Sequence, residues 1–229
     1  MMSEPTYHNV LAVDTATKRL NLALLFGGDR SVQSGEIVSR THGQIIMKKI
    51  DDLFSSAALS IGDLEAIVVS LGPGSFTGLR IGLAAAKGMA VARNIPIVGV
   101  TMFEVAADRI GRQSGVARIV IPSRKDEFYV GICRDGAVKD EDVAIMSESE
   151  LAASIGADQV YTIGYAPEDF VSEVLKQTAR RFEYEAGDVL RVGLDRLRRG
   201  EHADLASLEP VYLQKAIAEV RFDLRHGGN

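Results

Sequence analysis

The chain has 229 residues, 46% of them hydrophobic and 25% charged, which is typical of globular proteins and excludes disordered and low-complexity classes. Its 26 lysines and arginines against 31 aspartates and glutamates give a net charge of -5, which argues against a protein that binds nucleic acid on its own. The single cysteine excludes an internal disulfide, and the sequence shows neither a secretory pattern nor an apolar run of about 18 residues. We therefore expect a cytoplasmic protein without a membrane span.

The first hundred residues alternate apolar runs with turn residues, as is typical of a mixed sheet crossed by helices. In chain order, the expected elements are strands at 9–14, 20–26 and 31–38, a helix at 45–54, a strand at 67–69, a helix at 77–93 and a strand at 97–100. The short turns between the first three strands predict an antiparallel meander, because a parallel pair would need a long crossover. The order β-β-β-α-β-α-β indicates an α/β fold.

The second half of the chain carries weaker signals. Its expected elements are a hairpin of 117–121 with 127–132, helices at 147–154 and 168–179 around a strand at 160–163, and an amphipathic helix at 188–199. No linker rich in proline or serine separates the halves. We therefore expect two lobes that share an interface, residues 1–104 and residues 105–229.

A glycine-rich segment, Gly72–Gly82, follows one expected strand and opens a helix. At such a turn the free backbone N–H groups can receive a phosphate or a carboxylate. Ser75 or Thr77 can cap the helix. The segment lacks the Gly-Lys-Ser/Thr ending of a P-loop. Spacing alone leaves an anion site and a plain capped turn equally open.

Small residues recur at every fourth position along this helix: Gly78, Gly82, Ala86 and Ala90. An interior glycine costs a helix about 1 kcal/mol relative to alanine, so two of them on one line indicate the close approach of another backbone. That backbone can belong to the chain's own sheet or to a second subunit. The spacing by itself favours the chain's own sheet, which is the commoner use of such a face.

Three segments carry a resemblance to a known family: Leu11–Thr17, Gly72–Gly82 and Glu209–Leu213. Together they resemble the TsaB (YeaZ) family, the bacterial partner of the enzyme that installs threonylcarbamoyl on tRNA adenosine. His42-Gly43-Gln44 and Val98–Thr101 fit the same family. The resemblance implies an ASKHA-type fold, with two actin-like or Hsp70-like lobes whose mixed sheets are headed by β-β-β-α units.

The resemblance also implies where a nucleotide would lie in this fold. The residues with nucleotide-loop-like positions are Asp14, Thr15, Thr17, Gly72, Gly74, Ser75 and Thr77. The first three belong to the remnant of the first phosphate loop, and the rest lie across the cleft between the lobes. Ala16 stands where kinases of the fold have glycine, and Pro122-Ser123-Arg124 stands where the family tends to show Asp-Ala-Arg. The first departure argues against phosphoryl transfer, and the second argues against a role for an acidic group at position 122.

No catalytic residue is expected in this chain. The related catalytic subunit TsaD binds a metal with two histidines four residues apart, and Met102 and Ala106 take those places here. No Gly-x-Ser-x-Gly elbow is present, so a nucleophilic serine is not indicated. A group of C-terminal arginines could contact RNA, but the solvated face of an amphipathic helix is the favoured interpretation of Arg191, Arg196, Arg198 and Arg199.

The resulting hypothesis is a scaffold and activating subunit that works with TsaD and the small ATPase TsaE, without a metal or cofactor of its own. ATP and a metal are expected in the partner subunits, tRNA only through the complex, and a homodimer in isolation. Given the resemblance, the expected docking surface consists of Gly78, Gly82, Ala86, Ala90 and His42. The alternative is a small ASKHA-fold enzyme, a phosphotransferase or hydrolase, with a nucleotide cleft of its own.

Overall fold

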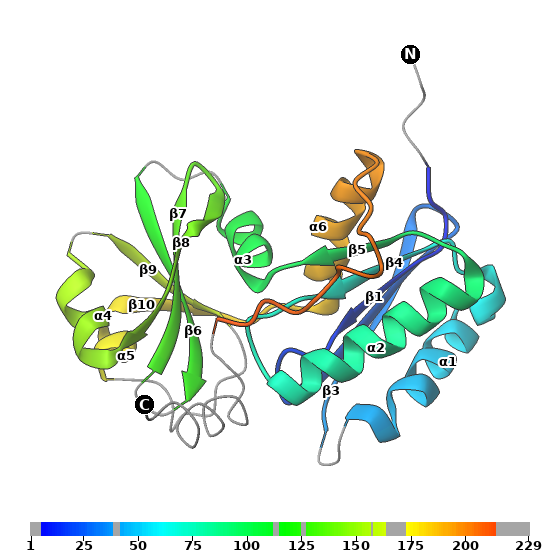
Figure 1. Cartoon of the computed structure of the whole chain (residues 1–229), viewed down its shortest axis with the longest axis horizontal. Helices are drawn as coiled ribbons and strands as arrows, with labels where there is room; N and C mark the ends of the chain where they lie inside the picture. Colours follow the sequence, from blue (N-terminus) through cyan, green and yellow to red (C-terminus); the bar gives the residue numbers. More distant parts are fainter. Residues whose placement is uncertain are drawn as a thin grey trace, which may run out of the picture.

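The computed structural model describes residues 6–38, 42–111, 115–124, 127–156, 158–163 and 173–213. The chain forms two five-stranded sheets, called sheet A and sheet B, each with helices on both faces (Figure 1). The elements up to residue 110 are β1 (Val10–Asp14), β2 (Arg19–Phe26), β3 (Arg30–Ile37), the 3-10 turn η1 (His42–Gln44), α1 (Ile46–Ser56), η2 (Ile61–Asp63), β4 (Ala66–Ser70), α2 (Phe76–Arg93), β5 (Ile97–Val100) and α3 (Met102–Ile110). The later elements are β6 (Val116–Arg124), β7 (Glu127–Arg134), β8 (Ala137–Ser147), α4 (Glu148–Ser154), β9 (Gln159–Ile163), α5 (Glu173–Thr178), β10 (Ala179–Phe182) and α6 (Ala186–Arg198).

The two sheets have the same topology. Sheet A has the order β3-β2-β1-β4-β5, and sheet B, taken in the same direction, has the order β8-β7-β6-β9-β10. In each sheet the first strand lies in the middle, antiparallel to the second strand and parallel to the fourth. Both are built from the succession β-β-β-α-β-α-β. This repeated mixed sheet is the two-lobe ASKHA architecture, and it confirms the fold class expected from the sequence.

Sheet A is covered on both faces, and its central strand β1 divides its side chains between two cores. Leu11 and Val13 pack in the core under α1 and α2, whereas Val10 and Ala12 pack in the core under α6. All four are fully buried. A strand that is buried on both faces reads as a continuous apolar run, which is why its sequence shows no polar alternation.

Helices α3 and α6 lie between the two sheets, and each packs on the sheet to which its preceding strand does not belong (Figure 1). Helix α3 follows β5 of sheet A but packs on sheet B, while α6 follows β10 of sheet B but packs on sheet A. Both contacts require glycine. A Cβ on Gly131 in β7 would come under 3.0 Å from Phe103 in α3, and a Cβ on Gly193 in α6 would come equally close to Val68 in β4. The lobes are therefore interlocked through one shared core.

Most of the expected elements are present, but three elements were not expected from the sequence: α3, β8 and β10. Strand β8 lies at an edge of sheet B with few buried side chains, and β10 has only four residues. The expected helix at 168–179 is helical over 173–178, residue 179 begins β10, and 164–172 lie outside the described residues. The expected lobe boundary at residue 104 falls inside α3. No helix in the described part of the chain is long and apolar enough to cross a lipid bilayer.

Two glycine-to-alanine variants test the packing of α6 on sheet A. We expect Gly193→Ala to lower the free energy of unfolding by about 1–3 kcal/mol, because the new methyl group has no space against Val68. Gly88→Ala in α2 is the matched control, since a Cβ there meets nothing within 4 Å. It should leave stability unchanged or raise it by up to about 1 kcal/mol through helix propensity. Urea unfolding measures both, and equal stability of the two variants would contradict the packing described.

Candidate functional site

The two segments with nucleotide-loop-like residues lie directly against one another. The backbone N–H of Ser75 donates to the carbonyl oxygen of Ala16 at 2.6 Å, and the hydroxyl of Thr15 donates to the carbonyl oxygen of Gly78 at 2.8 Å. Thr15 is only 1% exposed. The chain's own turn between β1 and β2 therefore packs against one side of the start of α2, whereas Ser75 and Thr77 on that first turn stay exposed.

Three glycines allow the turn to come this close to α2. A Cβ on Gly74 would lie under 3.0 Å from the carbonyl oxygen of Ala16, and a Cβ on Gly78 equally close to that of Thr15. A Cβ on Gly82 would meet the hydroxyl oxygen of Thr15 in the same way. The interior glycines thus do mark a close backbone approach, and the backbone that approaches belongs to the same chain.

These contacts correct the expectation that Gly78, Gly82, Ala86 and Ala90 form an open groove for a second subunit. Ala86 and Ala90 are 0% exposed and belong to the core under α2. His42, which was grouped with them, is 8% exposed, and within the described residues its Nε2 atom has no hydrogen-bond partner. In the part of the chain that the structure describes, these five residues offer almost no surface to a partner.

The carboxylate of Asp14, at the end of β1, is fully enclosed by hydrogen-bond donors. Its Oδ1 accepts from the backbone N–H of Ala16 at 2.9 Å. Its Oδ2 accepts from the side-chain amide of Asn21 at 3.0 Å and from the hydroxyl of Tyr184 at 2.6 Å. Asp14 and Asn21 are each 1% exposed, and Tyr184 is 0% exposed. The carboxylate is therefore satisfied internally and does not face solvent or an open cleft.

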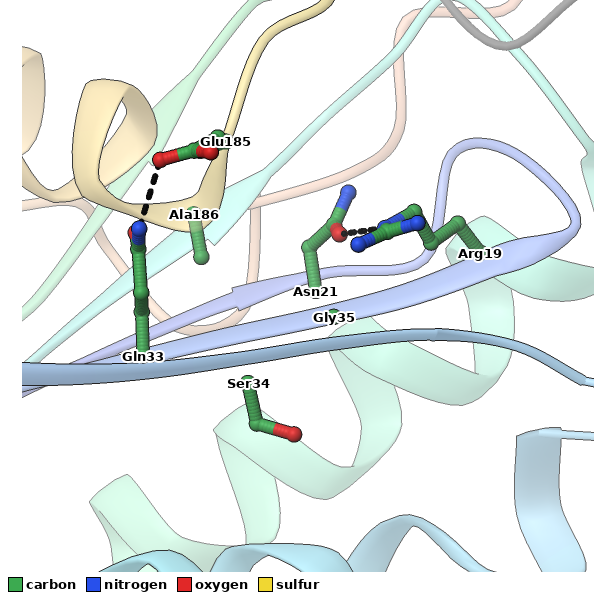
Figure 2. Close-up of a pocket in the computed structure, with 7 residues that line it drawn as sticks. All are labelled: Arg19, Asn21, Gln33, Ser34, Gly35, Glu185 and Ala186. Atoms are coloured by element: carbon green, nitrogen blue, oxygen red, sulfur yellow. Dashed lines mark hydrogen bonds between the residues drawn. The ribbon is translucent and has the colours of Figure 1, made fainter.

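A small hollow lies at the surface near this carboxylate, between sheet A and the start of α6 (Figure 2). Its lining includes Arg19, Asn21, Gln33 and Glu185. Two hydrogen bonds join these residues in pairs, from Arg19 Nε to Asn21 Oδ1 at 3.0 Å within β2 and from Gln33 Nε2 to Glu185 Oε2 at 2.5 Å between β3 and the start of α6. The cavity volume is about 50 Å³. Pockets for nucleotide-sized ligands measure about 300 Å³ or more, so this hollow is too small for one.

The remaining loop residues have structural roles. Ser75 caps α2, because its hydroxyl oxygen accepts from the backbone N–H of Gly78 at 3.2 Å, and this confirms one of the two caps expected. The hydroxyl of Thr17 accepts from the backbone N–H of Arg19 at 3.0 Å, while Thr77 is exposed on α2. Gly72 has φ +88°, a left-handed conformation that other residues rarely adopt.

Met102 and Ala106, which the resemblance sets against the metal-binding histidines of TsaD, lie in the apolar core. Met102 and Ala106 of α3 are 2% and 0% exposed, and the hydroxyl of Ser70 donates to the Met102 sulfur at 3.4 Å. Within the described residues, no three histidine, cysteine, aspartate or glutamate side chains are grouped as metal ligands would be. Burial raises the pKa of the Cys133 thiol above its ordinary value, which disfavours the nucleophilic thiolate.

Comparison with known proteins shows which proteins the chain is similar to. Residues 34–144 match the family described as "TsaD: tRNA N6-adenosine threonylcarbamoyltransferase". The tRNA threonylcarbamoyladenosine biosynthesis protein TsaB of Escherichia coli K12 is 34% identical over 52% of this chain and 52% of its own length. Its Bacillus subtilis counterpart is 26% identical over 93% and 97%. YeaZ from Pseudomonas aeruginosa has a TM-score of 0.71 and 26% identity, covering 90% of this chain and 100% of that structure. Over nearly its whole length, the chain is thus similar to proteins named TsaB and YeaZ. In the match to the E. coli relative, the chain spans about half of the relative's length.

The two sequence segments that resemble the TsaB (YeaZ) family outside β1 meet on the surface of the structure. Arg80 of α2 lies 3.9 Å from the ring centre of Phe76, and its Nε donates to the hydroxyl of Tyr212 at 2.8 Å. The rings of Phe76 and Tyr212 are 5.0 Å apart. The backbone N–H of Val211 also donates to the carbonyl oxygen of Leu71 at 2.8 Å. The Glu209–Leu213 segment is thereby fixed beside the glycine-rich segment.

The C-terminal arginines all pair with carboxylates. Arg191 pairs with Asp108 and Asp188, Arg196 with Glu104 and Glu201, Arg198 with Asp195, and Arg199 with Glu201. The hydrogen bond from Arg199 holds the pKa of Glu201 below its ordinary value. Arg191 and Arg196 tie α6 to α3 through these ion pairs. The sequence had predicted only a solvated helix face for them.

Tyr184 is the residue of this site that sequence reasoning missed. It lies 170 positions after Asp14 and follows a four-residue strand that was itself not expected. A single tyrosine between Glu183 and Glu185 carries no periodic signal. The only available hint was an aromatic residue just before a strongly amphipathic helix.

The glycine contacts of α2 give a direct test. We expect Gly82→Leu to lower the melting temperature of the isolated protein by several degrees, because overpacking typically costs about 1–3 kcal/mol and the side chain would collide with the turn at Thr15. Ala152→Leu, at an exposed position of α4, is the control and should melt close to the wild type. Differential scanning calorimetry compares the two. A Gly82→Leu protein that melts like Ala152→Leu would show that the turn does not rest on this part of α2.

Proposed function

We propose that the protein is a scaffold and activating subunit of the complex that adds threonylcarbamoyl to the adenosine beside the anticodon of tRNAs reading A-starting codons. In this proposal it works with a TsaD-type transferase and with TsaE in the cytoplasm, and contacts tRNA only through the complex. The names of its relatives support a role in this pathway, since they describe tRNA threonylcarbamoyladenosine biosynthesis proteins. The role within the pathway rests on the site geometry.

The observation that carries the role is that residues of the chain itself contact the candidate nucleotide-binding residues. The chain's own turn packs against the glycine side of α2. The oxygens of Asp14 accept hydrogen bonds from Ala16, Asn21 and Tyr184. A buried carboxylate that is satisfied in this way has little reason to exchange its donors for a ligand, because that would expose polar groups without partners. A protein with such a site acts through contact with another protein.

Cofactors then belong to the partner subunits. Met102 and Ala106 offer no ligand suited to a transition metal, since a thioether in an apolar core and a methyl group replace two imidazoles. The hollow beside Asn21 is too small for ATP. The same geometry argues against the alternative of a phosphotransferase or hydrolase that works in its own cleft.

The docking surface for the transferase is the solvent face of α2, opposite to the buried glycines. Thr77, Ile81, Ala84, Gly88 and Val91 recur at three- and four-residue spacing and form one stripe. Thr77, Ala84, Gly88 and Val91 are exposed, Val91 to 66%, and Ile81 is partly exposed. Small side chains at Ala84 and Gly88 allow another helix to come close. We assign this stripe to a TsaD-type subunit, and to a second copy of the chain when it is alone.

Reconstitution from purified components tests the proposed function. The chain, a TsaD-type transferase and TsaE from the same organism are mixed with threonylcarbamoyl-adenylate, ATP and unmodified tRNA, and the modified nucleoside is measured by mass spectrometry. We expect modification with the full set and a large loss when this chain is omitted. Modification by this chain alone, or full activity without it, would overturn the proposal.

A charged substitution on the stripe tests the docking surface separately. We expect Ala84→Arg to weaken binding to the TsaD-type subunit by roughly 5- to 150-fold, as expected if burying the charge costs about 1–3 kcal/mol of binding free energy. Ala137→Arg, at an exposed alanine of β8, is the matched control and should bind as the wild type does. Both variants should keep the wild-type melting temperature. Unchanged binding of a folded Ala84→Arg protein, measured by calorimetry, would place the docking surface elsewhere.

A further inference from the structure

Three residues, Glu183–Glu185, carry the chain from the last strand of sheet B to the helix that covers sheet A. Strand β10 ends at Phe182 and α6 begins at Ala186. The two glutamates of this connection are exposed, whereas Tyr184 between them is fully buried. A connection this short passes directly from one lobe to the other, and its middle side chain is its anchor point.

That anchor is the hydrogen bond between Tyr184 and Asp14. The phenol hydroxyl donates to the carboxylate at 2.6 Å, and neither residue is more than 1% exposed. Exclusion of water strengthens a hydrogen bond, because no solvent competes for either partner. Removal of the phenol hydroxyl would leave a buried carboxylate oxygen with one donor fewer. The bond therefore joins the interlobe connection to the centre of sheet A.

Weaker contacts hold the same end of α6. Gln33 of β3 donates to Glu185 at 2.5 Å and accepts from the backbone N–H of Gly187 at 3.1 Å (Figure 2). These bonds lie at the surface, where water competes for the same groups. They position α6 over β3 but are less able than the buried bond to hold the two lobes together.

On its other side, the start of α6 is tied to α3. Asp188 is 6% exposed and accepts from Arg109 of α3 at 3.0 Å and from Arg191 at 3.0 Å. Arg191 also pairs with Asp108 of α3. Since α3 packs on sheet B, these ion pairs and the Tyr184–Asp14 bond hold the start of α6 against both lobes at once.

We propose that Tyr184 is an interlobe latch, a side chain that fixes the angle between the two sheets by occupying the Asp14 carboxylate. With the latch in place, the two lobes keep one relative orientation without any bound ligand. The protein then presents one rigid shape to a partner. This inference does not depend on the proposed function, because it concerns the isolated chain.

A distance measurement between the lobes tests the latch. Nitroxide labels are placed at Ser55→Cys in α1 and Ala152→Cys in α4, both exposed positions, while the native Cys133 is buried and its raised thiol pKa disfavours labelling. Double electron–electron resonance should give one narrow distance distribution in the wild type. In Tyr184→Phe, which keeps the ring and loses the hydroxyl, we expect a broadened or second distribution.

Tyr161→Phe is the matched control, because the hydroxyl of Tyr161 donates to Gln159 in the same strand at 2.8 Å. It should keep the narrow distribution. Hydrogen exchange adds a local readout: in Tyr184→Phe, amides of 183–188 and 14–17 should exchange roughly 10-fold faster, with little change in the centre of sheet B. An unchanged distribution in folded Tyr184→Phe, or faster exchange spread evenly over both sheets, would overturn the proposal.

A second variant keeps the test decisive if Tyr184→Phe does not fold. Asp14→Ala removes both acceptor oxygens, so the hydroxyl of Tyr184 loses its acceptor together with the other two donors. We expect the same broadening of the interlobe distance. A folded Asp14→Ala protein with the narrow wild-type distribution would count against the latch.

Discussion

The structure depends on one close approach, that of the β1–β2 turn to the glycine side of α2. Gly74, Gly78 and Gly82 have no space for a side chain because Thr15 and Ala16 lie there. This contact fixes the end of β1 and hence the position of the buried Asp14 carboxylate. The same contact occupies the glycine side of the start of α2, where the backbone N–H of Ser75 already donates to Ala16.

The proposed scaffold role rests on two features, the buried carboxylate of Asp14 and the exposed face of α2. Asp14 has its hydrogen bonds satisfied from β2 and from the connection that leads to α6. The opposite face of α2 is left with small and apolar side chains, among them Val91 at 66% exposure. The Asp14 carboxylate is thus buried and hydrogen-bonded, whereas small and apolar side chains of α2 are exposed to solvent.

The sequence predicts local elements well where spacing alone decides them. The helix that starts beside Ser75 and the buried strand before Asp14 are found as expected, because periodicity and capping determine both. Four-residue spacing also revealed that α2 is approached closely, but it could not tell which backbone approaches. Ala84 and Gly88 have the same spacing as Gly78 and Gly82, so only burial separates the two faces. Tyr184 was missed because its partner lies 170 residues away.

The central claim is that the candidate nucleotide site is filled by the chain itself and that the protein works by binding another protein. Isothermal titration calorimetry of the isolated, wild-type protein tests it most directly. Titration with Mg-ATP and with threonylcarbamoyl-adenylate should give no saturable heat, whereas titration with the TsaD-type subunit should give a saturable isotherm. Saturable binding of either nucleotide with about one site per chain, together with no binding of the TsaD-type subunit, would contradict the account.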